Sequence, residues 1–422
     1  MSIITDLTRM WLTRSRRPFC FTNEYDSRLP FTDCADLGLY VHIPFCRSLC
    51  NFCPYCKQLY DSELCRQYVD ALLHEIDLVG RQRPGAERQK VTSLYFGGGT
   101  PALVAGRLAE IVQALARHFV ISEGIGLELH PEDVRPEIIA RLQNAGVSKL
   151  SIGVQSFQPR LLKLLGRQPP EVAGWGAALR QASFATVSMD FIFALPGQTL
   201  ADLQADIEQA QALGANHIAV YPFIDFAFTP TRVQPLRKQE KRRLLDALTD
   251  YCLSRGWRRT SIWTFARPSA VGRGGYSSMT RGNYLGFGCS AVTLLREQFK
   301  INTFSVPEYC RRLANDKLPT SLTLRFTPRQ RMLYYLFWVA YGMEFRAADF
   351  ARFFGVPLPE MYGAELKLAQ MLGWLTEQDG IYRLTKKGTF YYHYYENFYT
   401  LAYIDKMWGL MRHEPWPERL EL

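Results

Sequence analysis

The chain has 422 residues, of which 47% are hydrophobic and 21% are charged. These fractions are close to the averages of globular proteins, so they exclude a disordered or fibrous chain and favour a folded enzyme. Lys and Arg outnumber Asp and Glu by 50 to 40. The charges are scattered along the chain, which favours anionic ligands in general without requiring a nucleic acid.

The sequence contains no run of about 18 to 20 apolar residues, so it predicts no membrane span. The N-terminal segment has no basic start followed by a long apolar run, which argues against a secretory signal. A mitochondrial presequence stays open, because Asp6 is the only acidic residue before Glu24. We expect a cytoplasmic protein whose cysteines are reduced.

From residue 39 to about 266, short β-rich runs alternate with amphipathic helical stretches, which is typical of βα units that build a parallel sheet. The predicted strands are Leu39–Ile43, Ser93–Phe96, Leu127–His130, Lys149–Val154, Ser188–Ala194, His217–Phe223 and Thr260–Thr264. The predicted helices are Glu63–Val79, Gly106–His118, Pro136–Ala145, Trp175–Ala182, Leu200–Ala212 and Lys238–Ser254. About six units are too few for an eight-unit barrel. The sequence therefore predicts an α/β fold, a partial (β/α)6 barrel with its site at the C-terminal ends of the strands.

After residue 270 the alternation fades and a second unit is predicted. Thr327 and Pro328 predict a helix start, since Thr can cap a helix and Pro tolerates its first turn. Asp379-Gly380 lies between two runs of alternating apolar residues and predicts a tight hairpin. Helices combined with a hairpin suggest a C-terminal winged-helix-like domain. The predicted divisions are an N-terminal extension (1–38), the partial barrel (39–270), a connecting segment that covers the barrel (271–326) and the C-terminal domain with an aromatic tail (327–422).

Four of the ten cysteines, Cys46, Cys50, Cys53 and Cys56, lie within eleven residues. The first three have the spacing C-x3-C-x2-C and directly follow the first predicted strand. Soft thiolates suit an iron–sulfur cluster or zinc, and three ligands would leave one iron of a [4Fe–4S] cluster open for an external ligand. A structural zinc that also uses Cys56 is the alternative, although zinc ligands usually come as two pairs separated by a longer loop.

Three glycines (97–99) follow the second predicted strand and lead into Thr100. Because glycine has no Cβ, this backbone can approach a ligand closely; a plain strand-to-helix turn is the alternative. Glu128 lies near the end of the next strand, and Glu132 and Asp133 come just after it. These carboxylates predict an acidic rim at the mouth of the barrel.

Six blocks of sequence, in this order, resemble the radical S-adenosylmethionine (SAM) enzymes, and within them the oxygen-independent coproporphyrinogen III oxidase-like (HemN/HemW-like) family. The blocks are Leu39–Cys53, Tyr95–Pro101, Leu150–Phe157, Leu164–Arg167, Asp190–Thr199 and Tyr284–Ala291. The resemblance covers about residues 38 to 390 and includes the C-terminal domain.

The resemblance implies that Cys46, Cys50 and Cys53 bind a [4Fe–4S] cluster and that the chain binds one or two SAM molecules. It implies a cofactor-proximal or catalytic role for Tyr40 and Cys56. The implied SAM contacts are Gly98, Gly99, Thr100, Glu128, Gln155, Arg167, Asp190 and Tyr221. Three of these contacts, Gln155, Arg167 and Asp190, match positions that hold a second SAM in the decarboxylating enzyme.

The fourth cysteine departs from the family pattern. In the decarboxylating enzyme it lies two positions after the third, whereas Cys56 lies three positions after Cys53. In the haem-chaperone branch a Phe usually replaces it. This departure leaves the substrate open, although it does not affect the implied cofactor chemistry.

The implied reaction begins with one electron from the reduced cluster, which cleaves SAM to methionine and a 5′-deoxyadenosyl radical that abstracts a hydrogen from the substrate. A coproporphyrinogen- or tetrapyrrole-like substrate, or another unsaturated one, and an electron donor such as flavodoxin or ferredoxin are implied. A class C methyltransferase or cyclopropanase with two SAM molecules and a haem chaperone without turnover are the alternatives. Nucleic-acid binding is not expected, because no recognition helix of the C-terminal domain is visibly basic.

Overall fold

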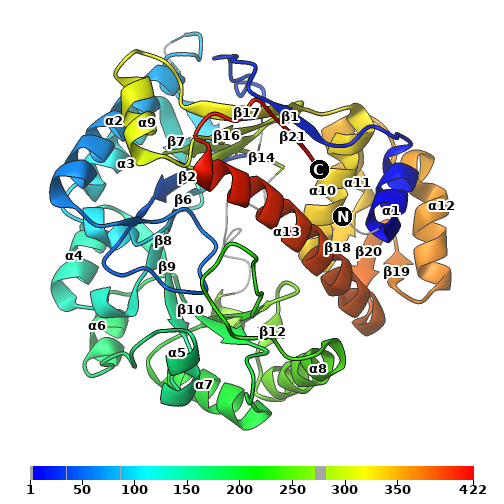
Figure 1. Ribbon diagram of the computed structural model, residues 1–422. Helices are drawn as coiled ribbons and strands as arrows, with labels where there is room; N and C mark the ends of the chain where they lie inside the picture. Colours follow the sequence, from blue (N-terminus) through cyan, green and yellow to red (C-terminus); the bar gives the residue numbers. More distant parts are fainter. Residues whose placement is uncertain (1–2, 35, 86, 271–281) are drawn as a thin grey trace.

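The computed structural model describes residues 3–34, 36–85, 87–270 and 282–422 (Figure 1). Residues 271–281 of the predicted connecting segment therefore lie outside the described residues. No helix within the described ranges is long and apolar enough to cross a membrane.

Six parallel strands form the centre of the main sheet and follow one another in chain order. They are β2 (Leu37–Ile43), β6 (Leu94–Gly98), β8 (Ile125–Leu129), β9 (Val147–Gln155), β10 (Thr186–Phe193) and β11 (His217–Pro222). The helices between and after them are α2 (Ser62–Gly80), α3 (Leu108–His118), α4 (Pro136–Asn144), α5 (Pro159–Leu164), α6 (Trp175–Gln181), α7 (Leu200–Ala212) and α8 (Lys238–Ser254). Figure 1 shows these helices along the outside of the curved sheet. The partial barrel of six βα units is confirmed.

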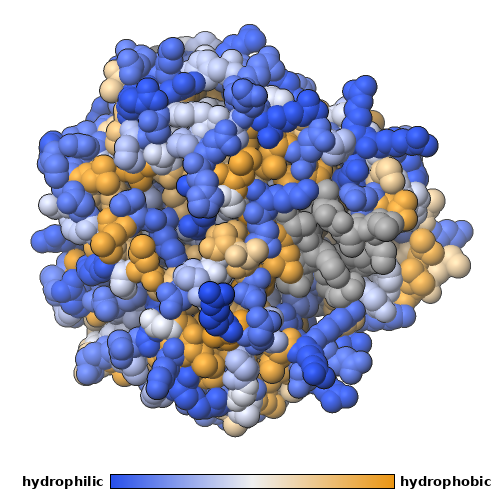
Figure 2. Space-filling model, in the orientation of Figure 1, coloured by the Kyte–Doolittle hydropathy of each residue, from blue (hydrophilic) through white to orange (hydrophobic). Residues whose placement is uncertain are grey.

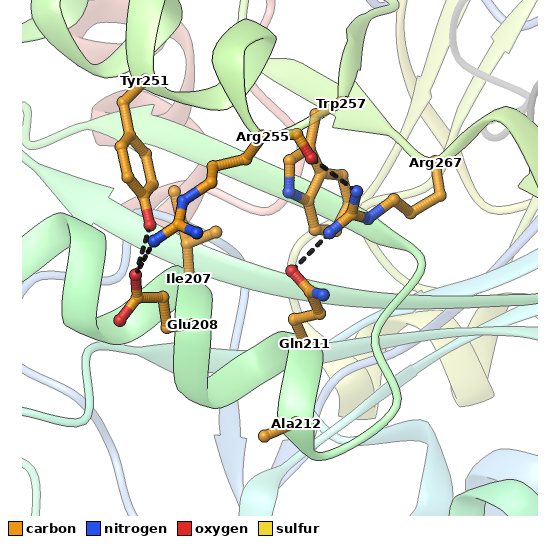
Figure 3. A pocket seen from close by; sticks show the side chains of 8 residues that line it. All are labelled: Ile207, Glu208, Gln211, Ala212, Tyr251, Arg255, Trp257 and Arg267. Atoms are coloured by element: carbon orange, nitrogen blue, oxygen red, sulfur yellow. Dashed lines mark hydrogen bonds and ion pairs between the residues drawn. The ribbon is translucent and has the colours of Figure 1, made fainter.

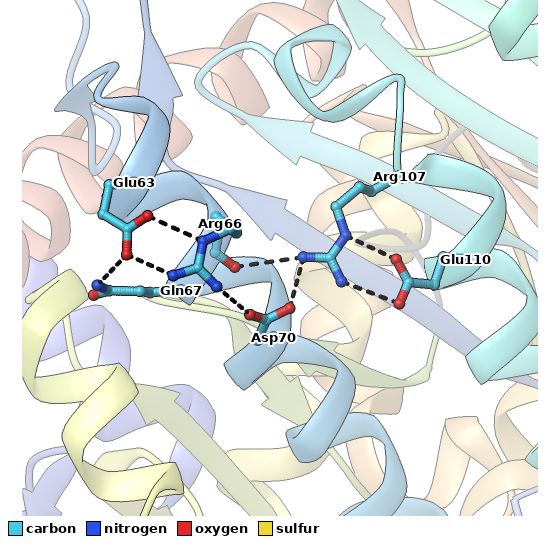
Figure 4. A network of polar contacts seen from close by, with 6 residues as sticks. All are labelled: Glu63, Arg66, Gln67, Asp70, Arg107 and Glu110. Carbon is cyan, nitrogen blue, oxygen red and sulfur yellow. Dashed lines mark hydrogen bonds and ion pairs between the residues drawn. The ribbon is translucent and has the colours of Figure 1, made fainter.

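Strands β2 and β10 are buried along nearly their whole length, because helices cover one face and the barrel interior lies on the other. Leu39, Val41 and Ile43 of β2 are fully buried. At the surface, ion pairs join α2 to the start of α3 (Figure 4). Arg107 donates to Asp70 over 2.7 Å and to Glu110 over 2.7 Å. Such exposed pairs contribute little to stability, so the buried strands hold the barrel together.

The predicted strand Thr260–Thr264 is wrong in its bounds. The chain forms a bend there, in which Thr260 N donates to Thr264 O over 2.9 Å. Two short strands flank the bend, β12 (Arg258–Arg259) and β13 (Thr264–Ala266), and β13 runs antiparallel to β11. The parallel part of the sheet therefore ends at β11 on this side.

On the other side of β2 the sheet continues through strands that come from distant parts of the chain. In sheet order these are β14 (Asn283–Phe287), β15 (Val292–Leu294), β16 (Gln298–Asn302), β17 (Thr320–Arg325), β1 (Cys20–Thr22) and β21 (Arg419–Glu421). β14 pairs parallel to β2, whereas the next strands pair antiparallel. The N-terminal and C-terminal segments thus share one sheet with the barrel. The helix α9 (Val306–Leu313) packs against α2.

The C-terminal part has a small hydrophobic core of its own, which includes Phe345, Phe350 and Tyr362. Its elements are α10 (Pro328–Tyr341), β18 (Glu344–Arg346), α11 (Ala347–Phe354), α12 (Leu358–Met371), β19 (Leu375–Gln378), β20 (Ile381–Leu384) and α13 (Lys386–His413). The predicted helix start and the hairpin are both present. Thr327 caps α10, and Asp379 and Gly380 have positive φ values of 53° and 74° between the paired strands β19 and β20.

The remaining elements are short. They are α1 (Ile3–Thr13), which packs against α10, the strands β3 (Phe45–Cys46), β4 (Gln58–Leu59), β5 (Gln89–Val91) and β7 (Phe119–Ile121), and the 3-10 helices η1 (Pro101–Val104), η2 (Pro131–Asp133) and η3 (Pro268–Ala270). The long helix α13 runs from α8, where Lys386 pairs with Asp250, to the cysteine loop, where Arg412 contacts Tyr55 (Figure 1).

Candidate functional site

The cysteine loop, residues 44–60, begins where β2 ends, at the C-terminal edge of the parallel strands. Strands β3 and β4 pair in parallel and close the loop on itself, with Cys46 opposite Leu59. Two further backbone bonds fix the closure, from Gln58 N to Pro44 O (2.7 Å) and from Tyr60 N to Cys46 O (2.9 Å). The three cysteines of the C-x3-C-x2-C motif therefore lie in a loop whose two ends are hydrogen-bonded to each other.

Three cationic side chains, those of Lys57, Arg167 and Arg412, contact atoms of this loop. Lys57 Nζ donates to the carbonyl oxygens of Cys50 and, over 3.1 Å, of Cys53. Arg167 Nε lies 3.2 Å from Cys50 Sγ, and its Nη1 donates to Gly153 O over 3.0 Å. Arg412 of α13 reaches the carbonyl oxygens of the loop as well. Positive charge around the loop favours thiolates and an anionic cluster.

A fourth cation, Arg47, ties the loop to the end of β8. Its guanidinium binds both oxygens of the Asp133 carboxylate, over 2.8 and 2.7 Å, and Asp133 is fully buried. This two-pronged geometry is the strong form of an ion pair. The predicted acidic rim is therefore wrong for Asp133, because the arginine of the cysteine loop neutralises it.

The thiols of the C-x3-C-x2-C motif are of the ligand type that holds an iron–sulfur cluster. No group of three or more His, Cys, Asp or Glu side chains has the geometry to hold one ion among the residues that the structure describes. In a [4Fe–4S] cluster each thiolate binds a different iron, so the sulfurs need not converge on one point. Burial, helped by the neighbouring Cys53, raises the pKa of Cys46 to about 11. Cys46 therefore needs a metal to lose its proton at neutral pH.

Cys56 is directed away from the other three cysteines and into the hydrophobic core. Its Sγ donates to Phe304 O over 3.3 Å and lies 4.0 Å from the Sγ of Cys289, which itself donates to Thr303 O over 3.1 Å. Cys56 is buried and Cys289 is fully buried. The fourth cysteine of the loop therefore packs as a core residue.

Gly98 and Gly99, at the end of β6, are required by the residues that pack on them, His42 of β2 and the cysteine loop. Gly98 has a φ of +113°, and a Cβ there would lie 2.6 Å from the His42 ring. A Cβ on Gly99 would lie 2.5 Å from Phe45 O and 2.9 Å from Cys46 Sγ. Their amides are engaged too, since Gly99 N donates to Ile43 O over 2.7 Å. The sequence predicts that this bare backbone approaches a ligand. In the structure the backbone packs instead against residues of the cysteine loop and of β2.

Glu128 and Tyr40 lie side by side behind these glycines. Glu128 Oε2 accepts from Gly98 N over 2.9 Å, and burial raises the pKa of Glu128 to about 7. Tyr40 Oη lies 3.0 Å from His42 Nδ1, and the Tyr40 ring stacks on Tyr95. A carboxyl group that titrates near neutral pH beside a cofactor loop is typical of a functional site.

The second predicted constellation is only partly assembled. Gln155 ends β9 with a φ of +71° and lies opposite Phe191, the neighbour of Asp190 on β10. Asp190 accepts from Ser151 and, over 3.0 Å, from Ser188, and burial raises its pKa to about 6. The third member, Arg167, points to Cys50 and not to Asp190.

Thr100 and Tyr221 complete the predicted contacts. Thr100 is buried next to the loop, and its N donates to Phe45 O over 2.7 Å. Tyr221 is 40% exposed at the end of β11, at the edge of the barrel mouth. Of the predicted residues outside the loop, Gly99, Thr100 and Arg167 thus contact it directly.

Sequence reasoning did not assign three residues that hold the site. His42 bridges Tyr40 and the carbonyl oxygen of Cys56 (3.3 Å), and burial lowers its pKa to about 4, so it is neutral. Lys57 follows the last cysteine directly, and a cation at that place could have been noticed. Arg412 lies more than 350 residues from the loop that it contacts, so no local signal could have indicated it.

A cavity of about 470 Å³ lies away from the cysteine loop, between α7 and α8 (Figure 3). Arg255 donates to Glu208 over 2.7 Å, and Arg267 donates to Gln211 and to the carbonyl oxygen of Arg255. Arg255 is therefore paired with a carboxylate, and Arg267 with an amide and a carbonyl oxygen. This cavity takes no part in the candidate site.

Several known proteins resemble this chain in sequence. Residues 40–210 match the model of the Radical SAM superfamily. The chain is 33% identical over 190 residues to the heme chaperone HemW of Lactococcus lactis, over 44% of this chain and 48% of the chaperone. It is 28% identical over 312 residues to the oxygen-independent coproporphyrinogen III oxidase of Pseudomonas aeruginosa, over 67% of this chain and 66% of the oxidase. The matches thus span about half to two thirds of these relatives.

The fold has a close counterpart among solved structures. The coproporphyrinogen III oxidase HemN of Escherichia coli, described as a radical SAM enzyme, superposes with a TM-score of 0.75 at 22% identity. The superposition covers 89% of this chain and 93% of HemN, so it includes the C-terminal part as well as the barrel. Residues 40–210 therefore match the Radical SAM superfamily, and the chain is similar in sequence to heme chaperones HemW and to oxygen-independent coproporphyrinogen III oxidases and has the fold of HemN.

Proposed function

We propose that this protein binds a [4Fe–4S] cluster through Cys46, Cys50 and Cys53 and cleaves SAM at the open iron. The observation that carries the proposal is the position of Cys56, whose sulfur packs against Cys289 in the core and not with the other three. A loop that presents three thiols can hold a cubic cluster and leave one iron for SAM. A loop that presented four would saturate the metal.

When bound, the reduced cluster supplies one electron that splits SAM into methionine and a 5′-deoxyadenosyl radical. The chain's own residues prepare this step. Lys57 and Arg167 offset the negative charge of the thiolates, and the bond from Gly98 to Glu128 fixes the backbone next to the loop. We assign the SAM contacts to the residues of this edge, namely Gly98, Gly99, Thr100, Glu128, Gln155, Asp190 and Tyr221.

We assign one SAM to the site. A second SAM held through its carboxylate by Arg167 would require that side chain to leave both Cys50 Sγ and Gly153 O. The contacts of Arg167 support a role in positioning the cluster loop. They do not favour a methyltransferase or cyclopropanase that uses two SAM molecules. Tyr40, hydrogen-bonded to His42 beside Glu128, is the better candidate for a group near the reacting atoms, and Cys56 is assigned to the core.

The substrate class that we propose is a tetrapyrrole, as for the oxidases that the chain resembles. The net charge of +10 favours a substrate with several carboxylates. A small electron-transfer protein such as flavodoxin or ferredoxin would reduce the cluster. The second candidate function, a haem chaperone without turnover, is supported by the 33% identity to HemW over 190 residues.

The cofactor proposal is tested by anaerobic reconstitution, with iron and sulfide analysis, electron paramagnetic resonance of the reduced protein and measurement of 5′-deoxyadenosine. Cys46→Ala, Cys50→Ala and Cys53→Ala should each lose the cluster and SAM cleavage. Cys56→Ser is the matched control from the same loop and should retain the cluster spectrum. Loss of the cluster in Cys56→Ser, or stoichiometric zinc without iron in the wild type, would contradict the three-thiol assignment.

The two functions are then separated with the reconstituted wild type. Turnover predicts that coproporphyrinogen III loses mass as carbon dioxide while 5′-deoxyadenosine accumulates with it, as detected by mass spectrometry. A chaperone predicts stoichiometric haem binding without substrate-dependent 5′-deoxyadenosine. Release of 5′-deoxyadenosine that no tetrapyrrole stimulates would leave the cluster assignment standing and overturn the substrate class.

A further inference from the structure

Tyr55 stands two residues after Cys53 in the cysteine loop, and 52% of its surface is exposed. Its backbone is held in place, because Arg412 of α13 donates to Tyr55 O over 2.7 Å and also to Pro54 O. The guanidinium of Arg412 itself lies 4.7 Å from the centre of the Phe228 ring. An exposed ring on a fixed backbone is a preorganised contact surface for a ligand.

The contacts of the next residue, Cys56, place Tyr55 beside the mouth of the barrel. Cys56 O lies 3.3 Å from Nε2 of His42, and Nδ1 of the same imidazole lies 3.0 Å from Tyr40 Oη. Burial and the nearby carboxylate of Glu128 raise the pKa of Tyr55. The Tyr55 side chain therefore lies near the residues at the C-terminal ends of the strands, and its exposed ring borders the barrel mouth.

The Tyr55 ring belongs to a row of three aromatic rings, those of Tyr55, Trp408 and Phe304, which we call the aromatic wall. The Tyr55 and Trp408 ring centres are 5.5 Å apart with 49° between the ring planes, and Trp408 meets Phe304 edge to face at 6.1 Å. Trp408 is half-buried and Phe304 is buried, so Tyr55 is the outer ring of the wall. Figure 2 shows hydrophobic side chains near the centre of this face, in the region of the view where α13 approaches the cysteine loop in Figure 1.

The aromatic wall and the assigned SAM contacts come from different parts of the chain. The SAM contacts lie at the ends of strands β6 to β11, whereas Tyr55 packs against Trp408 of α13. A substrate must meet the radical between these two sides, because hydrogen abstraction needs the reacting atoms to lie about 3 to 3.5 Å apart. The Tyr55 ring is therefore on the side of the mouth that is left for the substrate.

We propose that Tyr55 is a specificity-determining residue, whose ring binds a pyrrole ring of the tetrapyrrole at the end of the aromatic wall. Aromatic rings pair through offset-stacked or edge-to-face contacts, and the exposed Tyr55 ring offers both a face and an edge. This inference rests on the proposed tetrapyrrole class and names the residue that recognises it. It holds for a tetrapyrrole that is converted and for one that is carried, since the contact is with the pyrrole rings that both possess.

The test is titration of the reconstituted protein with coproporphyrin III under anaerobic conditions, with the fluorescence anisotropy of the porphyrin as the readout. Tyr55→Ala should weaken binding about tenfold, whereas Tyr55→Phe should bind within about twofold of the wild type because Phe keeps the ring. Tyr60→Ala is the matched control from the same loop. Tyr60 is 40% exposed, but its ring packs edge-on against Phe45, so the variant should bind as the wild type does.

Iron content, electron paramagnetic resonance and equilibrium dialysis with SAM check that each variant keeps the cluster and the cofactor site. Equal affinity of Tyr55→Ala and wild type for coproporphyrin III would overturn the role of Tyr55 and leave the substrate class standing. The same holds if Tyr55→Phe binds as weakly as Tyr55→Ala, or if Tyr55→Ala loses SAM binding but keeps coproporphyrin binding. Absence of saturable coproporphyrin binding to the wild type would overturn the proposed substrate class, and the role of Tyr55 with it.

Discussion

Glu128 allows a quantitative test of the site, because its carboxyl group is held at the barrel mouth next to Gly98 and close to Asp190. Burial raises its pKa from 4.5 to about 7. At about 1.36 kcal/mol per pKa unit, this difference of about 2.5 corresponds to about 3 kcal/mol of the free energy of unfolding. Glu128 keeps some exposure, so we expect about 2 to 3 kcal/mol.

The direction of the pH dependence follows from which state, folded or unfolded, binds the Glu128 proton more tightly. Between about pH 4.5 and pH 7 the folded protein holds the Glu128 proton more tightly than the unfolded chain does. The stability from Glu128 is therefore complete below about pH 4.5 and is lost as the pH rises to about 7. Glu128→Gln keeps an oxygen acceptor for Gly98 N and has no charge to bury. The variant should match the wild type near pH 4.5 and exceed its stability at pH 8.

Urea unfolding of the protein without SAM, at pH values from 4.5 to 8, measures this difference. The effects of other titrating groups are common to both proteins and cancel in the comparison. Glu418→Gln, at an exposed position, serves as the control and should show a difference that is nearly independent of pH. If the difference between Glu128→Gln and wild type were the same at pH 4.5 and pH 8, the buried carboxyl group would not titrate as the structure indicates.

Three further predictions concern the cations of the cysteine loop. Arg47→Ala leaves the buried Asp133 without its two-pronged partner and should lower thermal stability by about 2 kcal/mol, less than for a fully buried pair because Arg47 is 39% exposed; an unchanged melting temperature would contradict it. Arg412→Ala removes the contact of α13 with the carbonyl of Tyr55 and should speed proteolysis within the loop, whereas Arg412→Lys should restore part of the protection. Arg167→Ala should lower the stability of the cysteine loop by about 1.5 to 3 kcal/mol. Binding should stay at one SAM molecule per chain, as measured by equilibrium dialysis. Two SAM molecules per wild-type chain and one per variant chain would restore the two-SAM interpretation.

The sequence by itself determined the barrel and the cluster loop. Strands and amphipathic helices are predicted from the pattern of residues that are near neighbours in the chain. Their alternation therefore indicated six βα units from the sequence alone. The spacing of Cys46, Cys50 and Cys53 is likewise local, because a loop of eight residues cannot separate its thiols far. The sheet order confirmed the six βα units, whereas the cluster ligands stay a prediction.

Only the tertiary structure decided what surrounds that loop. Cys56 and Cys289 are 233 residues apart in the chain, and their contact arises because β14 lies next to β2 in the sheet. The glycines after β6 are explained by the Cys46 loop that packs on them, which no local pattern reveals. Spacing along the chain fixes which thiols can share a cluster, whereas burial and partners depend on segments that meet only when the sheet closes. For this reason the sequence predicted the ligands, and the fold decided the roles of Cys56 and Asp133.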